Sequence, residues 1–185
     1  MKFYGNCIGL IELNSIAAGY EVTDAMLKAA EVNLVVSRTV CAGKYIVLVR
    51  GDVAAVTASV AAGEAWGKGS VIDSFVIPNI HEQVCPAFTG TNPHGTIDAL
   101  GILESFTVAA LIEGADAAVK AAAVDLLEIR LAVALGGKAF VTLTGTVSAV
   151  QSAIEAGARV ISEKGVLVNQ VVIPNPREEL VEEYM

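Results

Sequence analysis

The chain has 185 residues, with twelve lysines and arginines against twenty aspartates and glutamates, a formal net charge of -8 and 54% hydrophobic residues. A chain this acidic repels phosphate backbones and anionic lipid, so nucleic acid is excluded as an expected partner. Mean hydropathy is high at +0.61, but no uninterrupted apolar run reaches the roughly 18 residues that a membrane span needs. The surplus hydrophobicity therefore predicts subunit interfaces and no membrane partner.

The cysteines and the start of the chain indicate a cytoplasmic protein. Cys7, Cys41 and Cys85 are odd in number and lack C-x-x-C spacing, which favours reduced thiols. The first residues, Met1 to Gly5, have no long apolar stretch of the kind found in secretion signals.

The first predicted elements surround a short loop. Cys7 to Leu13 reads as a central strand, and Ser15 is a plausible N-cap for an alanine-rich helix over Ile16 to Glu31. Two β-branched runs, Leu34 to Val36 and Tyr45 to Val49, then predict strands. The loop between them, Ser37 to Lys44, is expected to be exposed and contains Cys41.

The following elements complete one domain. Asp52 is a plausible N-cap for a helix over Val53 to Trp66, and Val71 to Ile77 predicts a strand ended by Pro78. His81 to Phe88 is expected to form a short closing helix. The order β-α-β-β-α-β-α predicts an α+β sandwich of about 90 residues.

The same order repeats in the second half. Shifting Ile8–Leu34 by 92 positions gives twelve identities in 27 residues, including Glu12 with Glu104, Lys28 with Lys120 and Leu34 with Leu126. At a shift of 94, Gly43-Lys44 matches Gly137-Lys138, and at a shift of 96, Val76-Ile77-Pro78-Asn79 matches Val172-Ile173-Pro174-Asn175. The chain is therefore predicted to be a tandem duplication with domains at 1–92 and 97–185, joined by a turn-rich linker at 89–95.

Cys41 admits two interpretations. From its position alone, it is more often a small inert residue in a tight loop than a ligand. One thiolate cannot hold a metal cluster, but a loop at a threefold axis would bring three copies of Cys41 together. Cys7, in a strand, and Cys85, at a helix end, are expected to pack in the interior, and neither histidine has the partners of a catalytic site.

Several motifs in order resemble the bacterial microcompartment (BMC) shell protein family. They are Gly9-Leu10-Ile11-Glu12, Asp24-Ala25-Met26-Leu27-Lys28-Ala29-Ala30, Arg50-Gly51-Asp52-Val53-Ala54-Ala55-Val56 and Val76-Ile77-Pro78, with weaker copies in the second half. The resemblance implies two unpermuted, ferredoxin-like shell domains and a non-enzymatic homotrimer that imitates a hexamer. It also implies a place in the microcompartment shell, beside other shell proteins.

Within the family, the chain is most similar to the T-type tandem members of propanediol-utilisation microcompartments. There, a cysteine in the pore loop of the first domain binds one [4Fe-4S] cluster per trimer, and Cys41 matches that position. The resemblance implies that Cys41 binds the metal of the cluster. The implied role of the cluster is either electron transfer across the shell or cluster supply to an encapsulated redox enzyme. The implied pore-loop residues are Arg38, Thr39, Val40, Ala42, Gly43, Lys44, Val133, Ala134, Leu135, Gly136 and Gly137.

The chemistry of this loop agrees with that implication. Three thiolates would leave one iron of a cuboidal cluster open to another ligand. Gly43 allows a close backbone approach, and Arg38 and Lys44 would stabilise a thiolate if they point toward it. Because Val133 stands in place of Cys41 in a second loop two residues longer, alternate pore loops are expected to differ in role.

The resemblance also implies contacts between tiles. In this family, lysines at the positions of Lys28 and Lys120 lie at the tile edge. Many members carry arginine in a second edge motif, where this chain has Asn79 and Asn175. The implied edge residues are Lys28, Lys120, Asn79, His81, Asn175 and Arg177.

Two alternatives stay open. One is a shell tile whose plain pore conducts a metabolite, with no cluster. The other is a small ferredoxin-like enzyme, for which the sequence offers no convincing catalytic residue.

Overall fold

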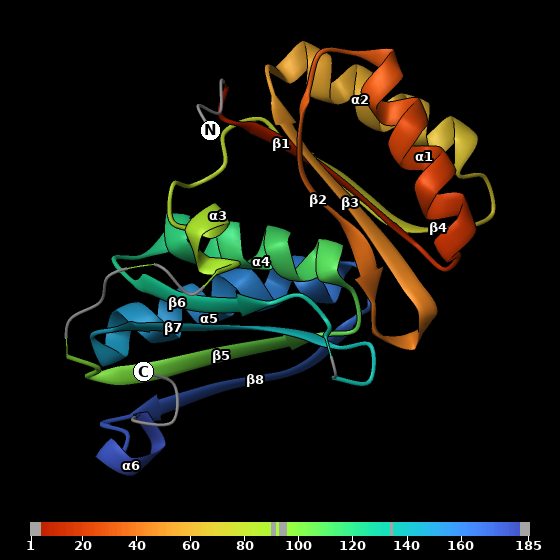
Figure 1. Cartoon of the computed structure of the whole chain (residues 1–185). Helices are drawn as coiled ribbons and strands as arrows, with labels where there is room; N and C mark the ends of the chain where they lie inside the picture. Colours follow the sequence, from red (N-terminus) through yellow and green to blue (C-terminus); the bar gives the residue numbers. More distant parts are fainter. Residues whose placement is uncertain (1–4, 90–91, 93–95, 134, 182–185) are drawn as a thin grey trace. The chain divides into compact units, whose positions relative to one another are not determined.

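The computed structural model of the chain describes residues 5–89, 92, 96–133 and 135–181 (Figure 1). The chain divides into two compact units. The first is Met1–Ile80 with Thr107–Ala109 and Ala132–Gly137, and the second is His81–Phe106, Ala110–Leu131 and Lys138–Met185. Each unit has a four-stranded sheet, which confirms the predicted α+β duplication. The domain boundaries at 92 and 97 stay a prediction.

The first unit has the predicted order of elements as far as β4. The predicted closing helix over His81–Phe88 is shorter, Val84–Ala87, and belongs to the second unit. Its sheet is antiparallel, in the order β2-β3-β1-β4. Its elements are β1 (Cys7–Leu13), α1 (Ile16–Ala29), β2 (Asn33–Val40), η1 (Cys41–Gly43), β3 (Lys44–Gly51), α2 (Val53–Trp66) and β4 (Val71–Ile77).

The apolar run of β1 forms the centre of this unit. All seven residues are buried. β3 and β4 flank the strand, and α1 and α2 cover one face of the sheet (Figure 1). The hydroxyl of Ser15 accepts a hydrogen bond from Ala18 N at 3.3 Å, so the predicted N-cap is confirmed. Ile11 and Leu13 pack with Val22 and Met26 of α1, which accounts for the helical spacing of the apolar residues.

Gly9 marks a close approach of α2 to the sheet. A Cβ atom at Gly9 would lie 2.5 Å from Val60 Cγ2 and 2.7 Å from Val56 Cγ1. We therefore expect Gly9→Ala to lower the free energy of unfolding by about 1–3 kcal/mol, because the added methyl overpacks the interface. Urea denaturation would measure this loss, with Ala61→Ser on the exposed side of α2 as the control. An unchanged midpoint for Gly9→Ala would contradict the packing.

The second unit repeats the arrangement. Its sheet has the order β6-β7-β5-β8, and α5 packs against β5 and β8. Its elements are α3 (Val84–Ala87), β5 (Ala99–Ser105), α4 (Val108–Ala121), β6 (Asp125–Arg130), β7 (Ala139–Gly145), α5 (Val147–Glu163), β8 (Leu167–Pro174) and α6 (Glu178–Val181).

One expectation about the first half was wrong. The predicted loop from Ser37 is shorter, because residues 37–40 continue β2 and pair with β3 as far as Val40 opposite Lys44. The Ser37 hydroxyl lies 2.9 Å from the Tyr45 hydroxyl of β3 and 3.0 Å from that of Thr23 in α1. Polar side-chain contacts therefore hold a segment that its composition suggested was a turn.

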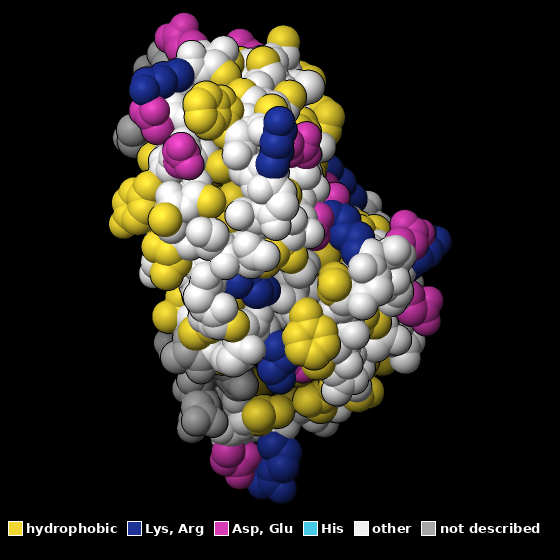
Figure 2. Space-filling model, turned by 90° about the vertical axis from the view of Figure 1, so that its right-hand side faces the viewer, with side chains coloured by type: hydrophobic (Ala, Val, Ile, Leu, Met, Phe, Trp, Pro, Cys, Tyr) yellow, Lys and Arg dark blue, Asp and Glu magenta, His cyan; other side chains and the backbone are white. Residues whose placement is uncertain are grey.

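Apolar side chains also reach the surface. Tyr20, Trp66 and Phe106 are more than half exposed, and the face drawn in Figure 2 has hydrophobic side chains scattered among acidic and basic ones. In the described part of the chain, no helix is long and apolar enough to cross a membrane. The surplus hydrophobicity is thus shared between two sheet cores and the surface.

Candidate functional site

The turn that carries Cys41 is tight. β2 ends at Val40, β3 begins at Lys44, and Cys41–Gly43 form a single 3-10 turn between them. Ala42 has a φ of 64° and Gly43 a φ of 71°. A left-handed alanine is uncommon because its Cβ crowds the backbone, whereas glycine adopts this conformation freely. The Cys41 residue is half-buried, and the space next to Gly43 is open.

A second turn in the same unit holds Cys41 in place. Cys41 N donates a hydrogen bond to Ala132 O at 2.7 Å, and Ala132 itself has a φ of 51°. Gly137 has a φ of 87°, which strains any residue with a Cβ atom, and a Cβ atom there would lie 3.2 Å from Ala42 Cβ. The equivalent loops of the two repeats thus meet at the cysteine.

A buried ion pair lies beneath these turns. Glu12 is fully buried, and its Oε1 accepts a hydrogen bond from Lys44 Nζ at 2.8 Å. Its Oε2 accepts from Ala109 N at 3.0 Å, and Lys44 Nζ also donates to Gly137 O at 3.4 Å. The lysine expected to stabilise a thiolate therefore has its charge balanced by Glu12, and it ties β1 to both turns.

Glu12 and Lys44 both belong to repeated motifs of the sequence, which does not show that they pair. Glu104 and Lys138 form the equivalent ion pair in the second unit at 2.5 Å, with Lys138 40% exposed. Both members recur in the second repeat, Glu12 as Glu104 at a shift of 92 residues and Lys44 as Lys138 at a shift of 94. This double recurrence is the sequence signal that could have identified the ion pair.

The remaining pore-loop residues differ in exposure. Arg38 and Thr39 are exposed on β2, whereas Val40 is buried. Val133 is 55% exposed, Leu135 is half-buried and Gly136 has a φ of 62°. Ala134 lies outside the described residues.

No complete metal site exists within the described residues of one chain. Nowhere in residues 5–89, 92, 96–133 and 135–181 do three His, Cys, Asp or Glu side chains gather as ligands for a metal ion. None of Cys7, Cys41 and Cys85, all in the described part of the chain, forms a disulfide. Cys7 is buried in β1, and burial raises the pKa of its thiol. Cys85 is half-buried in α3, so Cys41 is the thiol in a turn.

The expected edge residues fall into two patterns. Lys28 forms an exposed ion pair with Asp24, whereas Lys120 pairs with Asp116, which is 9% exposed. Asp116 Oδ1 also accepts a hydrogen bond from His81 N at 2.8 Å. The second unit thus brings His81 and Lys120 together around one carboxylate.

The other edge residues lie on the surface. Asn79 is exposed, and Asn175 is exposed with a φ of 48°. Arg177 forms an exposed ion pair with Glu179 at 2.8 Å, and this hydrogen bond lowers the pKa of the Glu179 carboxyl.

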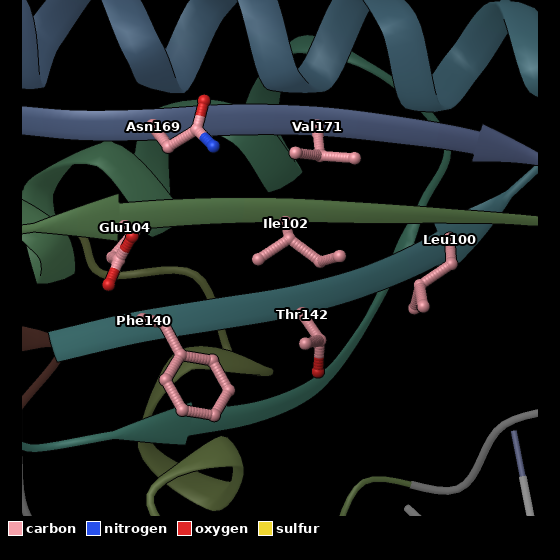
Figure 3. A pocket seen from close by; sticks show the side chains of 7 residues that line it. All are labelled: Leu100, Ile102, Glu104, Phe140, Thr142, Asn169 and Val171. Carbon is pink, nitrogen blue, oxygen red and sulfur yellow. The ribbon is translucent and has the colours of Figure 1, made fainter. Parts of the chain in front are cut away.

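The second unit has an open depression on one face of its sheet. It has a volume of about 250 Å³, and its side chains project from three neighbouring strands (Figure 3). They are Leu100, Ile102 and Glu104 of β5, Phe140 and Thr142 of β7, and Asn169 and Val171 of β8. The lining is mostly apolar, with one carboxylate that pairs with Lys138.

Comparisons with known proteins agree with this architecture. The family model of the BMC domain matches twice, at residues 7–80 and 99–176. The chain is 45% identical to the bacterial microcompartment shell protein PduT of Citrobacter freundii over 94% of both chains. It is 41% identical to the carboxysome shell protein CsoS1A of Hydrogenovibrio crunogenus, over 48% of this chain and 96% of that protein.

A solved structure gives the same result. The crystal structure of a microcompartments protein from Desulfitobacterium hafniense DCB superposes with a TM-score of 0.85 and is 53% identical, over 95% of this chain and 98% of that chain. About half of the present chain corresponds to a whole single-domain shell protein, and its full length to a tandem one. The chain therefore belongs to the BMC domain family and is a structural, non-enzymatic tile of a bacterial microcompartment shell, with two BMC domains in tandem.

Proposed function

We propose that three copies of this chain close into a ring and hold one [4Fe-4S] cluster at the central pore through their three Cys41 thiolates. The single observation that carries the proposal is the position of Cys41. It is a half-buried thiol outside any disulfide, it lies in a tight turn, and hydrogen bonding to Ala132 fixes its backbone. Because one chain offers no ligand set among its described residues, a cluster here requires several chains.

The open depression of the second unit supports assembly. Its lining residues Leu100, Ile102 and Glu104 are the repeat equivalents of Ile8, Leu10 and Glu12. The first-unit residues are completely buried, whereas those of the second unit border an open hollow. An apolar sheet face that is covered in one repeat and open in the other fits contact with a further copy of the chain. Shell proteins of this family assemble into oligomeric tiles with other shell proteins.

The residues around Cys41 fit an iron–sulfur cluster. Thiolate sulfur is the usual ligand of such clusters, and Cys41 is not engaged in a disulfide. Its neighbours in the turn are alanine and glycine, and the space beside Gly43 is open. Small side chains leave room for a large inorganic group.

The surrounding residues have a positioning role. The Glu12–Lys44 ion pair anchors the start of β3, one turn after Cys41. The hydrogen bond from Cys41 N to Ala132 O fixes the backbone from which the cysteine side chain projects. A bound cluster would supply a one-electron carrier at the pore, suited to electron transfer across the shell or to cluster supply for an enclosed redox enzyme.

Anaerobic purification tests the proposal. The protein should be isolated without oxygen from iron-replete cells and analysed for iron and sulfide, with an EPR spectrum of the reduced sample. We expect equal amounts of iron and acid-labile sulfide and the signal of a [4Fe-4S] centre. A trimer without iron would instead support a plain pore that conducts a metabolite.

A further inference from the structure

The segment after β4 covers the edge of the second unit's sheet. Helix α3 packs against β6, the edge strand. The Gln83 side chain accepts a hydrogen bond from Leu126 N at 2.8 Å and donates one to Asp125 Oδ1 at 3.1 Å. Asn92 Nδ2 donates to Leu126 O at 2.8 Å. Side chains thus satisfy the outward backbone groups of Leu126, and this leucine is 0% exposed.

The first unit has the same strand edge without this cover. Leu34 is the repeat equivalent of Leu126, and both strands have a bulge at the next residue. Leu34 pairs with Val49 as Leu126 pairs with Leu143, so its outward groups lie on the free edge of β2. Leu34 is 37% exposed. Within the described residues, nothing takes the place that Gln83 has at Leu126.

The chain has a second copy of the covering segment. At the shift of 96 residues, Gln83 corresponds to Glu179 and His81 to Arg177. Both segments make the same first turn, with Val84 N donating to His81 O at 3.1 Å and Leu180 N to Arg177 O at 3.0 Å. The second copy, Arg177–Val181, includes helix α6, and we call it the C-terminal clip.

The polar partners change together between the repeats. In the second unit, Gln83 donates a hydrogen bond to Asp125. In the repeat, Glu179 is the equivalent of Gln83 and Asn33 is the equivalent of Asp125. A glutamate accepts a hydrogen bond and an asparagine amide donates one, so the bond is preserved with its direction reversed. A carboxylate oxygen of Glu179 can also accept from Leu34 N, as Gln83 Oε1 does from Leu126 N.

We infer that the C-terminal clip of one copy covers the β2 edge of the next copy, with Glu179 bound to Asn33 and to the Leu34 amide. In a closed ring, first and second halves alternate, and the segment that ends each half contacts the next half around the ring. The half that follows a second half is the first half of another chain. The inference rests on the proposed ring and specifies its interface. It gives the exposed edge strand a partner that prevents uncontrolled strand pairing.

A swap of the polar partners tests the contact. Asn33→Asp places a carboxylate opposite Glu179 and should raise the dissociation constant of the trimer at least tenfold. The double variant Asn33→Asp with Glu179→Gln recreates the Asp125–Gln83 pair and should restore the wild-type value. Glu179→Gln alone is the matched control and should have little effect, because the glutamine oxygen can accept from Leu34 N while its NH2 donates to Asn33 Oδ1, as Gln83 does with Leu126 and Asp125. Analytical ultracentrifugation at a series of concentrations measures all four proteins.

The outcomes separate the two proposals. If the wild-type protein is trimeric and the Asn33→Asp trimer has the same dissociation constant, the clip contact is wrong and the ring remains. If the wild-type protein is not trimeric, the ring itself fails and the inference fails with it.

A disulfide identifies the chain that supplies the clip. The double variant Asn33→Cys with Glu179→Cys, oxidised gently, should give covalent dimers and trimers on a non-reducing gel. Gln83→Cys with Asp125→Cys is the positive control and should close within one chain, and each single variant reports the background from the native thiols. A product with the mobility of a monomer, or no new disulfide, would contradict a clip between copies.

Discussion

Replacing Cys41 with serine is expected to remove the iron from the anaerobically purified protein and to leave its assembly unchanged. Serine keeps the size of the side chain and loses the thiolate that an iron–sulfur cluster requires. The backbone hydrogen bond from Cys41 N to Ala132 O is independent of the side chain, so the turn should keep its conformation. Iron and sulfide assays on size-matched fractions measure the loss.

Cys85→Ser is the matched control for this experiment. Cys85 is also a half-buried thiol outside any disulfide, but it lies in helix α3 and not in a turn. This variant should keep the full iron content. A Cys41→Ser protein with wild-type iron and EPR signal would remove Cys41 from the cluster site.

Glu12→Ala is expected to lower the free energy of unfolding by about 3–5 kcal/mol. The carboxylate is fully buried and the Lys44 side chain is 14% exposed, so the variant leaves a largely buried ammonium without its counter-charge. It also removes the acceptor of the Ala109 amide. Urea denaturation followed by circular dichroism measures the effect.

Asp24→Ala provides the comparison on the same unit. Asp24 and Lys28 form an ion pair with both side chains more than 60% exposed, and water replaces such a pair at little cost. We expect a change within about 0.5 kcal/mol for this variant. If Glu12→Ala cost no more than Asp24→Ala, the buried pair would have no structural role.

Local sequence patterns were sufficient for most of the fold. The apolar run Cys7–Leu13 and the Ser15 N-cap each determine structure through neighbouring residues, and β1 and the start of α1 lie where expected. The repeat then supplied the second unit, because two similar sequences with the same order of elements form similar sheets.

Contacts between distant residues could not be predicted in the same way. The segment Ser37–Val40 has the composition of a turn, but its pairing with β3 and its hydroxyl contacts keep it in a strand. The burial of Glu12 depends on Lys44, 32 residues away, and on Ala109, 97 residues away. Single-residue signals contain no information about such partners.

The candidate site shows the same division. The position of Cys41 between two strands follows from the sequence, whereas its hydrogen bond to Ala132 joins turns of different repeats. The unequal exposure of Leu34 and Leu126 is likewise invisible in the sequence, where the two residues are identical partners in the repeat. Only the structure shows which copy of a repeated motif is covered.

Native mass spectrometry of the anaerobically isolated assembly tests the ring and the cluster together, because it counts chains and inorganic atoms in one particle. We expect a single species of three chains plus one [4Fe-4S] cluster, and three chains alone for Cys41→Ser. Wild-type particles with three chains and no added mass, or with iron bound to each separate chain, would contradict this expectation.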